Sequence, residues 1–153
     1  MKNLLLCFSL VMLFVSCSSD DDGDAVVGEL TQTEMLNNGS PWNFRNAEVV
    51  TVMRNELNLS NEELVAISED GSFPTFNFNN NGTVLLTEGS TEITASFDIL
   101  NGDIVLTASD NSTLILENIE VSENEFSFTT EYDYIENNDT SVSSFWTSRL
   151  FYE

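Results

Sequence analysis

The chain has 153 residues, with 26 Asp and Glu against 4 Lys and Arg, a formal net charge of −22 and no His. So negative a surface repels phosphate, which argues against nucleic-acid binding and against attachment to anionic lipid through a basic patch. The lack of His excludes His-based triads and most zinc sites. With 41% hydrophobic residues and 11 Phe, the chain is expected to fold around a packed core.

The N-terminus has the pattern of a secretory leader. Lys2 is followed by an apolar run over residues 4–15, which is shorter than the roughly 20 residues that span a bilayer but typical of a signal peptide. We therefore predict a signal peptide over residues 1–16. The only cysteines are Cys7, within the run, and Cys17, directly after it. No disulfide can therefore staple the domain that follows.

The junction Phe14-Val15-Ser16-Cys17 resembles the lipobox of bacterial lipoproteins, although Phe14 and Val15 stand where Leu and a small residue are commoner. The resemblance implies that Cys17 is lipidated and holds the mature chain to the membrane. The alternative is an ordinary signal peptide with an incidental cysteine. Two or three acyl chains would make the anchor essentially permanent.

A polar and acidic run follows Cys17, consisting of Ser18, Ser19, Asp20, Asp21 and Asp22. It resembles the export signal of surface lipoproteins in Bacteroidetes-type bacteria, which implies an outer-membrane protein exposed at the cell surface. A plain solvated tether is the alternative. Calcium binding is disfavoured, because adjacent aspartates point in different directions and a calcium loop needs spaced ligands. Residues 17–28 are predicted to be a lipidated acidic tether, and residues 29–153 the folded domain.

From residue 42 onward, apolar and polar residues mostly alternate, which predicts β-strands. Asn101-Gly102 is a strong hairpin signal. The alternation slips phase near Glu117-Asn118, which predicts a bulge there. Eight strands are expected, over residues 42–53, 73–78, 83–87, 91–99, 104–108, 114–121, 126–134 and 142–152.

One helix is predicted between the first two strands, over residues 61–68. Ser60 and Glu63 have the spacing of a capping box, and Leu59 and Leu64 that of a hydrophobic staple. We expect this helix to plug one end of a barrel.

Eight short strands with hairpin links favour an all-β, eight-stranded up-and-down antiparallel barrel with one short helix after the first strand. Closure hides the edge strands. The interior of such a barrel either fills with side chains or holds one small ligand. A β-sandwich remains the alternative, since alternation is the same in both.

The stretches PWNF, FNFNNNGTV, TASFDILNGDIVLT, ENIEVSENEFSFTTEY and SFWTSRLFYE resemble the lipocalin-like domains of Bacteroidetes-type lipoproteins. The resemblance covers roughly residues 29–153 and rests on hairpin rhythm and aromatic placement. Phe97 stands where members often carry Trp. The family implies a small calyx-like barrel with a helix after the first strand, and no particular ligand.

The candidate ligand-binding residues are aromatics expected to point into the barrel, where they either fill the core or line a cavity. Trp146 is placed inside because Arg149 shares the opposite face with Phe145 and Phe151. That face is a possible partner surface. The inward set is Phe76, Phe78, Phe97, Phe126, Phe128, Tyr132, Tyr134 and Trp146.

Other motifs do not indicate catalysis or a metal. Asn77, Asn79, Asn81, Gly82 and Glu88 have the spacing of an EF-hand loop, but strands flank them and a hairpin turn explains the same residues. Acidic pairs are unavoidable in so acidic a chain, and GxSxG is absent. We predict no catalytic residue, no metal site and no cofactor.

The expected function is therefore that of a surface-anchored, non-catalytic lipoprotein whose barrel binds a small apolar or amphipathic ligand. The alternative is an interaction module with a filled barrel, which contacts a protein or glycan of an envelope assembly.

Overall fold

The computed structural model describes residues 30–135 and 143–153 of the chain. The predicted signal peptide, the tether, Cys17 and the run Ser18–Asp22 lie outside the described residues. No helix within the described part is both long and apolar enough to cross a bilayer. The described elements are α1 (Gln32–Gly39), β1 (Phe44–Asn55), α2 (Asn61–Glu69), β2 (Thr75–Asn79), β3 (Thr83–Glu88), β4 (Thr91–Leu100), β5 (Asp103–Ala108), β6 (Thr113–Val121), β7 (Phe126–Ile135) and β8 (Ser143–Tyr152).

The strands form one antiparallel sheet in the order β1-β8-β7-β6-β5-β4-β3-β2. The sheet curls until its two end strands approach each other. Trp42, just before β1, forms an isolated bridge with Phe76 of β2, in which the Trp42 N–H donates to the Phe76 carbonyl at 2.8 Å and the Phe76 N–H donates to the Trp42 carbonyl at 3.0 Å. The predicted eight-stranded up-and-down architecture with a short helix after the first strand is confirmed. Its curl is that of a half-barrel.

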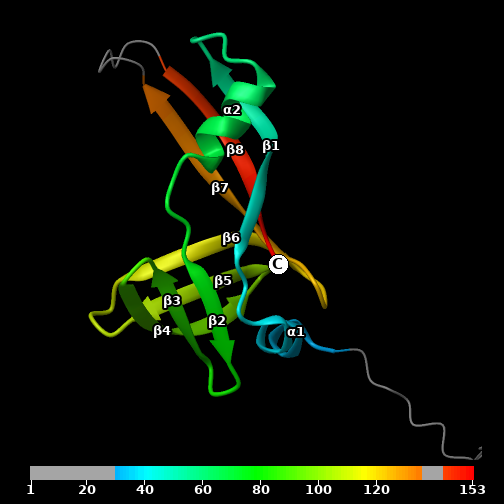
Figure 1. Cartoon of the computed structure of the whole chain (residues 1–153), viewed down its shortest axis with the longest axis vertical. Helices are drawn as coiled ribbons and strands as arrows, with labels where there is room; N and C mark the ends of the chain where they lie inside the picture. The colour runs from blue at the N-terminus through cyan, green and yellow to red at the C-terminus, as the bar shows by residue number, and fades with distance from the viewer. Residues whose placement is uncertain (1–29, 136–142) are drawn as a thin grey trace, which may run out of the picture.

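Three long strands extend beyond the rest of the sheet, as the upper half of Figure 1 shows. β6 pairs with β7 only from Glu117↔Thr129 to Val121↔Phe126, with an irregularity between Glu117 and Glu120. Asn118, inside that irregularity, has a φ of 50°, which confirms the predicted bulge. Beyond this point only β7, β8 and β1 continue as a three-stranded sheet. We call this part the arm; it consists of residues 130–135 of β7, 143–148 of β8 and 49–55 of β1.

Helix α2 lies on the arm, so the expectation that it plugs the barrel is wrong. Its capping box forms as predicted, with the Ser60 hydroxyl accepting from the Glu63 N–H and the Glu63 carboxylate accepting from the Ser60 N–H. Ser144 and Ser148 of β8 are both buried on the arm. Because their side chains are small, α2 can lie close to β8. The Glu69 carboxylate also accepts from the N–H of Ala47 on β1 at 2.8 Å.

Helix α1, which was not predicted, occupies one end of the half-barrel instead. Thr31 and Glu34 form a capping box at its start. Leu36 is fully buried in the core cluster, and its carbonyl accepts from the indole N–H of Trp42 at 2.8 Å. Gly39 is required at the end of the helix, because a Cβ there would lie 2.1 Å from the Trp42 ring.

Candidate functional site

Five of the eight aromatic residues predicted to bind a ligand pack against one another inside the half-barrel. Neighbouring rings lie 5.0 to 6.1 Å apart, mostly edge to face, an arrangement worth about 0.5–1.5 kcal/mol per pair beyond area burial. Tyr152 and Trp42 join the same cluster. The packing gives these rings a core-filling role. The five are Phe76, Phe78, Phe97, Phe126 and Phe128.

The other three lie on the arm. Trp146, which was expected to point into the barrel, is fully buried under α2 instead, and it stacks on Tyr132 with ring centroids 5.4 Å apart. The Trp146 indole donates to the Ser68 hydroxyl at 2.9 Å, and the Tyr132 hydroxyl donates to the Ser68 carbonyl at 3.0 Å. Burial raises the pKa of Tyr132. Tyr134, farther out, is 37% exposed. Trp146 and Tyr132 thus fasten α2 to the arm, and Tyr134 does not take part.

A hollow that could hold a ligand lies outside this aromatic cluster. It is formed by β3, β4, β5 and β6, at the end of these strands that is farther from α1. We call it the apolar hollow. It has a volume of 160 Å³. None of the eight predicted aromatics lines it. Its lining consists of Leu86, Ile93, Ala95, Leu106, Ala108 and Leu114, with Ser112 and Thr113 completing the wall.

Two features of the sequence create the apolar hollow. Alternation along β4, β5 and β6 places Ile93, Ala95, Leu106, Ala108 and Leu114 on the concave face of the sheet. Ala95 and Ala108 lie directly opposite each other in the β4–β5 pair, and their small side chains leave space where larger residues would fill the interior. Ile93 and Leu114 are 49% and 50% exposed, so aliphatic surface faces solvent at the mouth. A facing Ala–Ala pair between Ile and Leu is the sequence signal that points to this hollow.

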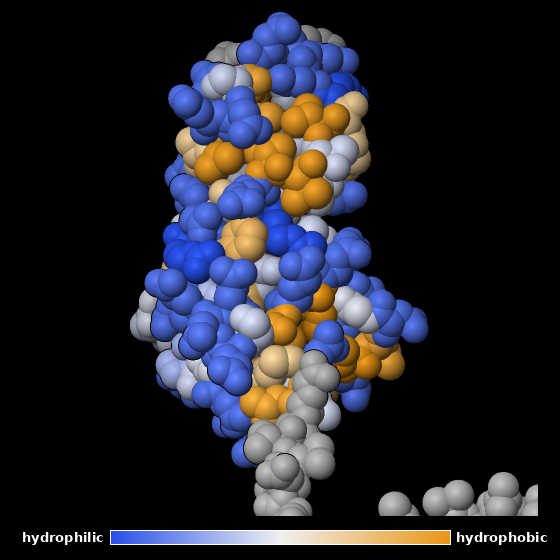
Figure 2. Space-filling model, turned by 90° about the vertical axis from the view of Figure 1, so that its right-hand side faces the viewer, coloured by the Kyte–Doolittle hydropathy of each residue, from blue (hydrophilic) through white to orange (hydrophobic). Residues whose placement is uncertain are grey.

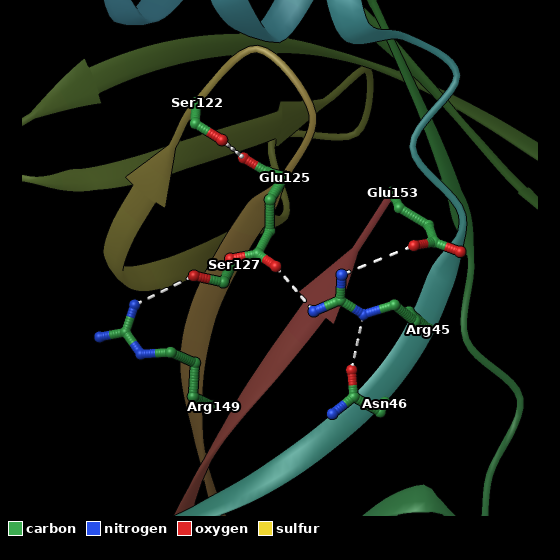
Figure 3. A network of polar contacts seen from close by, with 7 residues as sticks. All are labelled: Arg45, Asn46, Ser122, Glu125, Ser127, Arg149 and Glu153. Atoms are coloured by element: carbon green, nitrogen blue, oxygen red, sulfur yellow. Dashed lines mark hydrogen bonds and ion pairs between the residues drawn. The ribbon is translucent and has the colours of Figure 1, made fainter.

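The three arginines of the described residues are all engaged on the outer face of β1 and β8. Arg45 pairs with Glu125 at 2.7 Å and with Glu153 at 3.5 Å, as Figure 3 shows. The Glu125 hydrogen bond raises the pKa of Arg45. Arg149 pairs with Glu120 at 3.1 Å and Arg54 with Asp133 at 3.9 Å. These contacts join β1 to the β6–β7 turn, to the residue after β8 and to β7, and they join β8 to β6.

The predicted face of Phe145, Arg149 and Phe151 exists, but it is not an open aromatic patch. Phe145 and Phe151 are only partly exposed. The Arg45 guanidinium lies 5.6 Å from the centre of the Phe151 ring, a cation–π distance. Cation–π stacking and the ion pairs around it give this face a structural role.

Exposed aliphatic residues gather on β1 instead. Figure 2 shows hydrophobic surface on the upper half of the face that β1 and α2 present. Val50, Val52 and Met53 are the exposed hydrophobic residues of β1. The register of β1 on β8 shifts next to Val50 and again next to Met53. Such bulges disturb the pairing edge of a strand.

The EF-hand-like spacing is a hairpin, as expected. Asn77 and Asn79 belong to β2, Glu88 ends β3, and Gly82 takes a φ of +77° in the turn between them. The Asn81 side chain accepts from the N–H and hydroxyl of Thr83. Across residues 30–135 and 143–153, no group of three or more His, Cys, Asp or Glu is placed to hold a metal ion.

Comparison with protein-family models, with curated proteins and with solved structures finds no match for this chain. These comparisons therefore indicate no ligand, partner or activity for the chain.

Proposed function

We propose that the protein is a non-catalytic binding domain that takes a small apolar or amphipathic molecule into the apolar hollow. The observation that carries the proposal is the pairing of a 160 Å³ aliphatic space with half-exposed Ile93 and Leu114 at its mouth. Exposed aliphatic surface is costly in water, at about 25 cal/mol per Å², and a ligand that covers it recovers this free energy.

The size of the hollow sets the size of the group it accepts. A dry cavity of about 150 Å³ lined by Leu, Ile and Phe side chains binds benzene in another protein. The apolar hollow is as large, so it suits one ring or one short alkyl chain. The remainder of a longer ligand would extend into solvent through the mouth between Ile93 and Leu114.

The binding proposal is tested with the full lipidated chain held in nanodiscs. Native mass spectrometry after exposure to envelope lipid extracts should detect bound small molecules on the wild type. Ala108→Leu, which fills the hollow, should abolish them. Thr107→Val, on the opposite face of the same strand, is the matched control and should retain them. An identical set of bound species on wild type and Ala108→Leu would contradict the proposal.

We also propose that the domain works at the outer face of the outer membrane, anchored through Cys17. The leader, the cysteine at its end and the run Ser18–Asp22 support this location. Protease added to intact cells should degrade the protein. Replacing Asp20, Asp21 and Asp22 with Ala should make it resistant, with its abundance unchanged. If the Ala variant stays sensitive to protease, the aspartates act only as a tether and not as an export signal. If the wild type is fully resistant, the protein is not exposed at the cell surface.

A second candidate function is that of an interaction module in an envelope assembly. The filled aromatic interior and the exposed Val50, Val52 and Met53 of β1 favour it. A Val50→Ser, Val52→Thr double variant should then lose cross-links to neighbouring envelope proteins in intact cells. Ile93→Thr, at the hollow, is the matched control and should keep them. Unchanged cross-linking of the β1 variant would contradict this function.

A further inference from the structure

The mouth of the apolar hollow lies between two hairpin turns, one joining β3 to β4 and the other joining β5 to β6. Leu86 and Ile93 form a facing pair in the first hairpin, followed outward by Thr87↔Glu92 and Glu88↔Thr91. Side chains alternate between the faces of a strand, so Glu88 belongs to the same concave face as Leu86. A carboxylate therefore stands at one rim of the hollow.

A second carboxylate stands at the other rim. Asp110 accepts hydrogen bonds from the hydroxyl of Ser112 at 2.6 Å and from its N–H at 2.9 Å, and Ser112 lines the hollow. These two hydrogen bonds hold the carboxylate in place. They also lower the pKa of Asp110, so this side chain is ionised at neutral pH.

Among residues 30–135 and 143–153, no basic side chain neutralises this rim. Strands β2 to β6 and their turns, residues 75–121, contain seven acidic residues and no Lys, Arg or His. The arginines, at positions 45, 54 and 149, lie on β1 and β8, where each already pairs with a carboxylate. The mouth of the hollow is thus apolar at its centre and negative at both edges.

We propose that the ligand of the apolar hollow is a small cationic amphiphile, an alkyl or aryl ammonium compound. Its apolar end enters between Ile93 and Leu114, and its ammonium group lies between Glu88 and Asp110. This inference rests on the proposed ligand-binding function and specifies the chemistry of the ligand. Carboxylates select against an anionic head group of the same size, which they repel.

The test compares three water-soluble probes that share one alkyl chain: hexylammonium, hexanol and hexanoate. The full lipidated chain is held in nanodiscs of zwitterionic lipid, with empty nanodiscs as the blank. Binding is followed by the methyl NMR signals of Ile93 and Leu114, which report on the hollow itself. An exposed charge pair gives a weak attraction in water that added salt screens. Hexylammonium should therefore bind about three- to tenfold more tightly than hexanol at low salt, and hexanoate least tightly.

Two variants remove the rim charges without changing side-chain size, Glu88→Gln and Asp110→Asn. Together they should bring the affinity for hexylammonium down to that for hexanol, with the hexanol affinity unchanged. Glu92→Gln is the matched control, because Glu92 lies in the same hairpin on the opposite face of the sheet. It should preserve most of the preference. High salt should weaken hexylammonium binding and leave hexanol binding as it is.

The outcomes separate the two proposals. If no probe shifts the Ile93 or Leu114 signals, the ligand-binding function itself fails, and the inference fails with it. If all three probes bind equally, or hexanoate binds best, the hollow binds apolar groups but the inference about charge is overturned. A preference for hexylammonium that survives Glu88→Gln with Asp110→Asn would also overturn it.

Discussion

The indole N–H of Trp146 donates a 2.9 Å hydrogen bond to the hydroxyl of Ser68, and both side chains are buried. The same hydroxyl lies 2.8 Å from the hydroxyl of Ser148 and 2.9 Å from the carbonyl of Leu64. One serine of α2 thus satisfies polar groups of β8 that water does not reach. This contact holds α2 on the arm.

Ser68→Ala should therefore destabilise the protein by about 1–3 kcal/mol, because it leaves the Trp146 N–H buried without an acceptor. Urea unfolding followed by circular dichroism measures the loss. Ser72→Ala, at an exposed position just beyond α2, is the control and should change stability by less than about 0.5 kcal/mol. Equal stability of the Ser68 and Ser72 variants would mean that the buried hydrogen bond contributes nothing measurable.

Gly39→Ala should loosen the plug that α1 forms at the end of the half-barrel. The new methyl group would lie 2.1 Å from the ring of Trp42, so helix and ring must separate, at a cost of about 1–3 kcal/mol. The matched control is Gly71→Ala, where the nearest atom is 3.7 Å away on Phe73. Thermal unfolding of both variants measures the difference. A melting temperature that falls as far for Gly71→Ala as for Gly39→Ala would contradict the role of Gly39.

The strands and the helix after the first strand were predictable because their signals are local. Alternation identified each strand to within about two residues, the Ser60–Glu63 capping box identified α2, and the phase slip at Glu117-Asn118 identified the bulge. Thr31 and Glu34 carry the same capping signature. Helix α1 could therefore have been predicted from that signature.

The placement of the helices and of the hollow depends on contacts that no local pattern records. α2 lies on the arm because Ser144 and Ser148 are small and Ser68 meets Trp146 across 78 positions of the chain. Period-two alternation identified the concave face. It did not show that the aromatics gather at one end while Ala95 and Ala108 leave space at the other. Alternation predicts which side chains point to the concave face. It does not predict which of those side chains line a cavity and which fill the core.

Alkaline pH should destabilise the protein through Tyr152. This side chain is buried beside Phe128 and Phe126, and burial raises its pKa above the ordinary tyrosine value of about 10. The folded state then keeps the proton longer than the unfolded state does. The associated stability is fully present below pH 10 and is lost as pH rises toward the folded-state pKa.

The measurement is the difference in unfolding free energy between pH 8 and pH 11. Tyr152→Phe should reduce this difference, whatever its effect on stability at pH 8, because no proton is left to lose at this site. Tyr134→Phe, at a partly exposed position, is the control and should behave as the wild type does. A wild-type difference that Tyr152→Phe leaves unchanged would assign the alkaline loss to other groups.

Added NaCl should stabilise the protein, because repulsion among its carboxylates outweighs its few ion pairs. The formal net charge is −22, and raising ionic strength from 0.01 to 0.1 M shortens the screening length from about 30 to about 10 Å. The ion pairs of Arg45 and Arg54 are partly exposed, so each contributes little to stability and loses little on screening. The melting temperature should rise across this range. Arg45→Gln, which removes a positive charge, should steepen the rise, and Glu92→Gln, which removes a negative one, should flatten it. A melting temperature that falls with salt would show instead that the paired arginines dominate the electrostatic free energy of the fold.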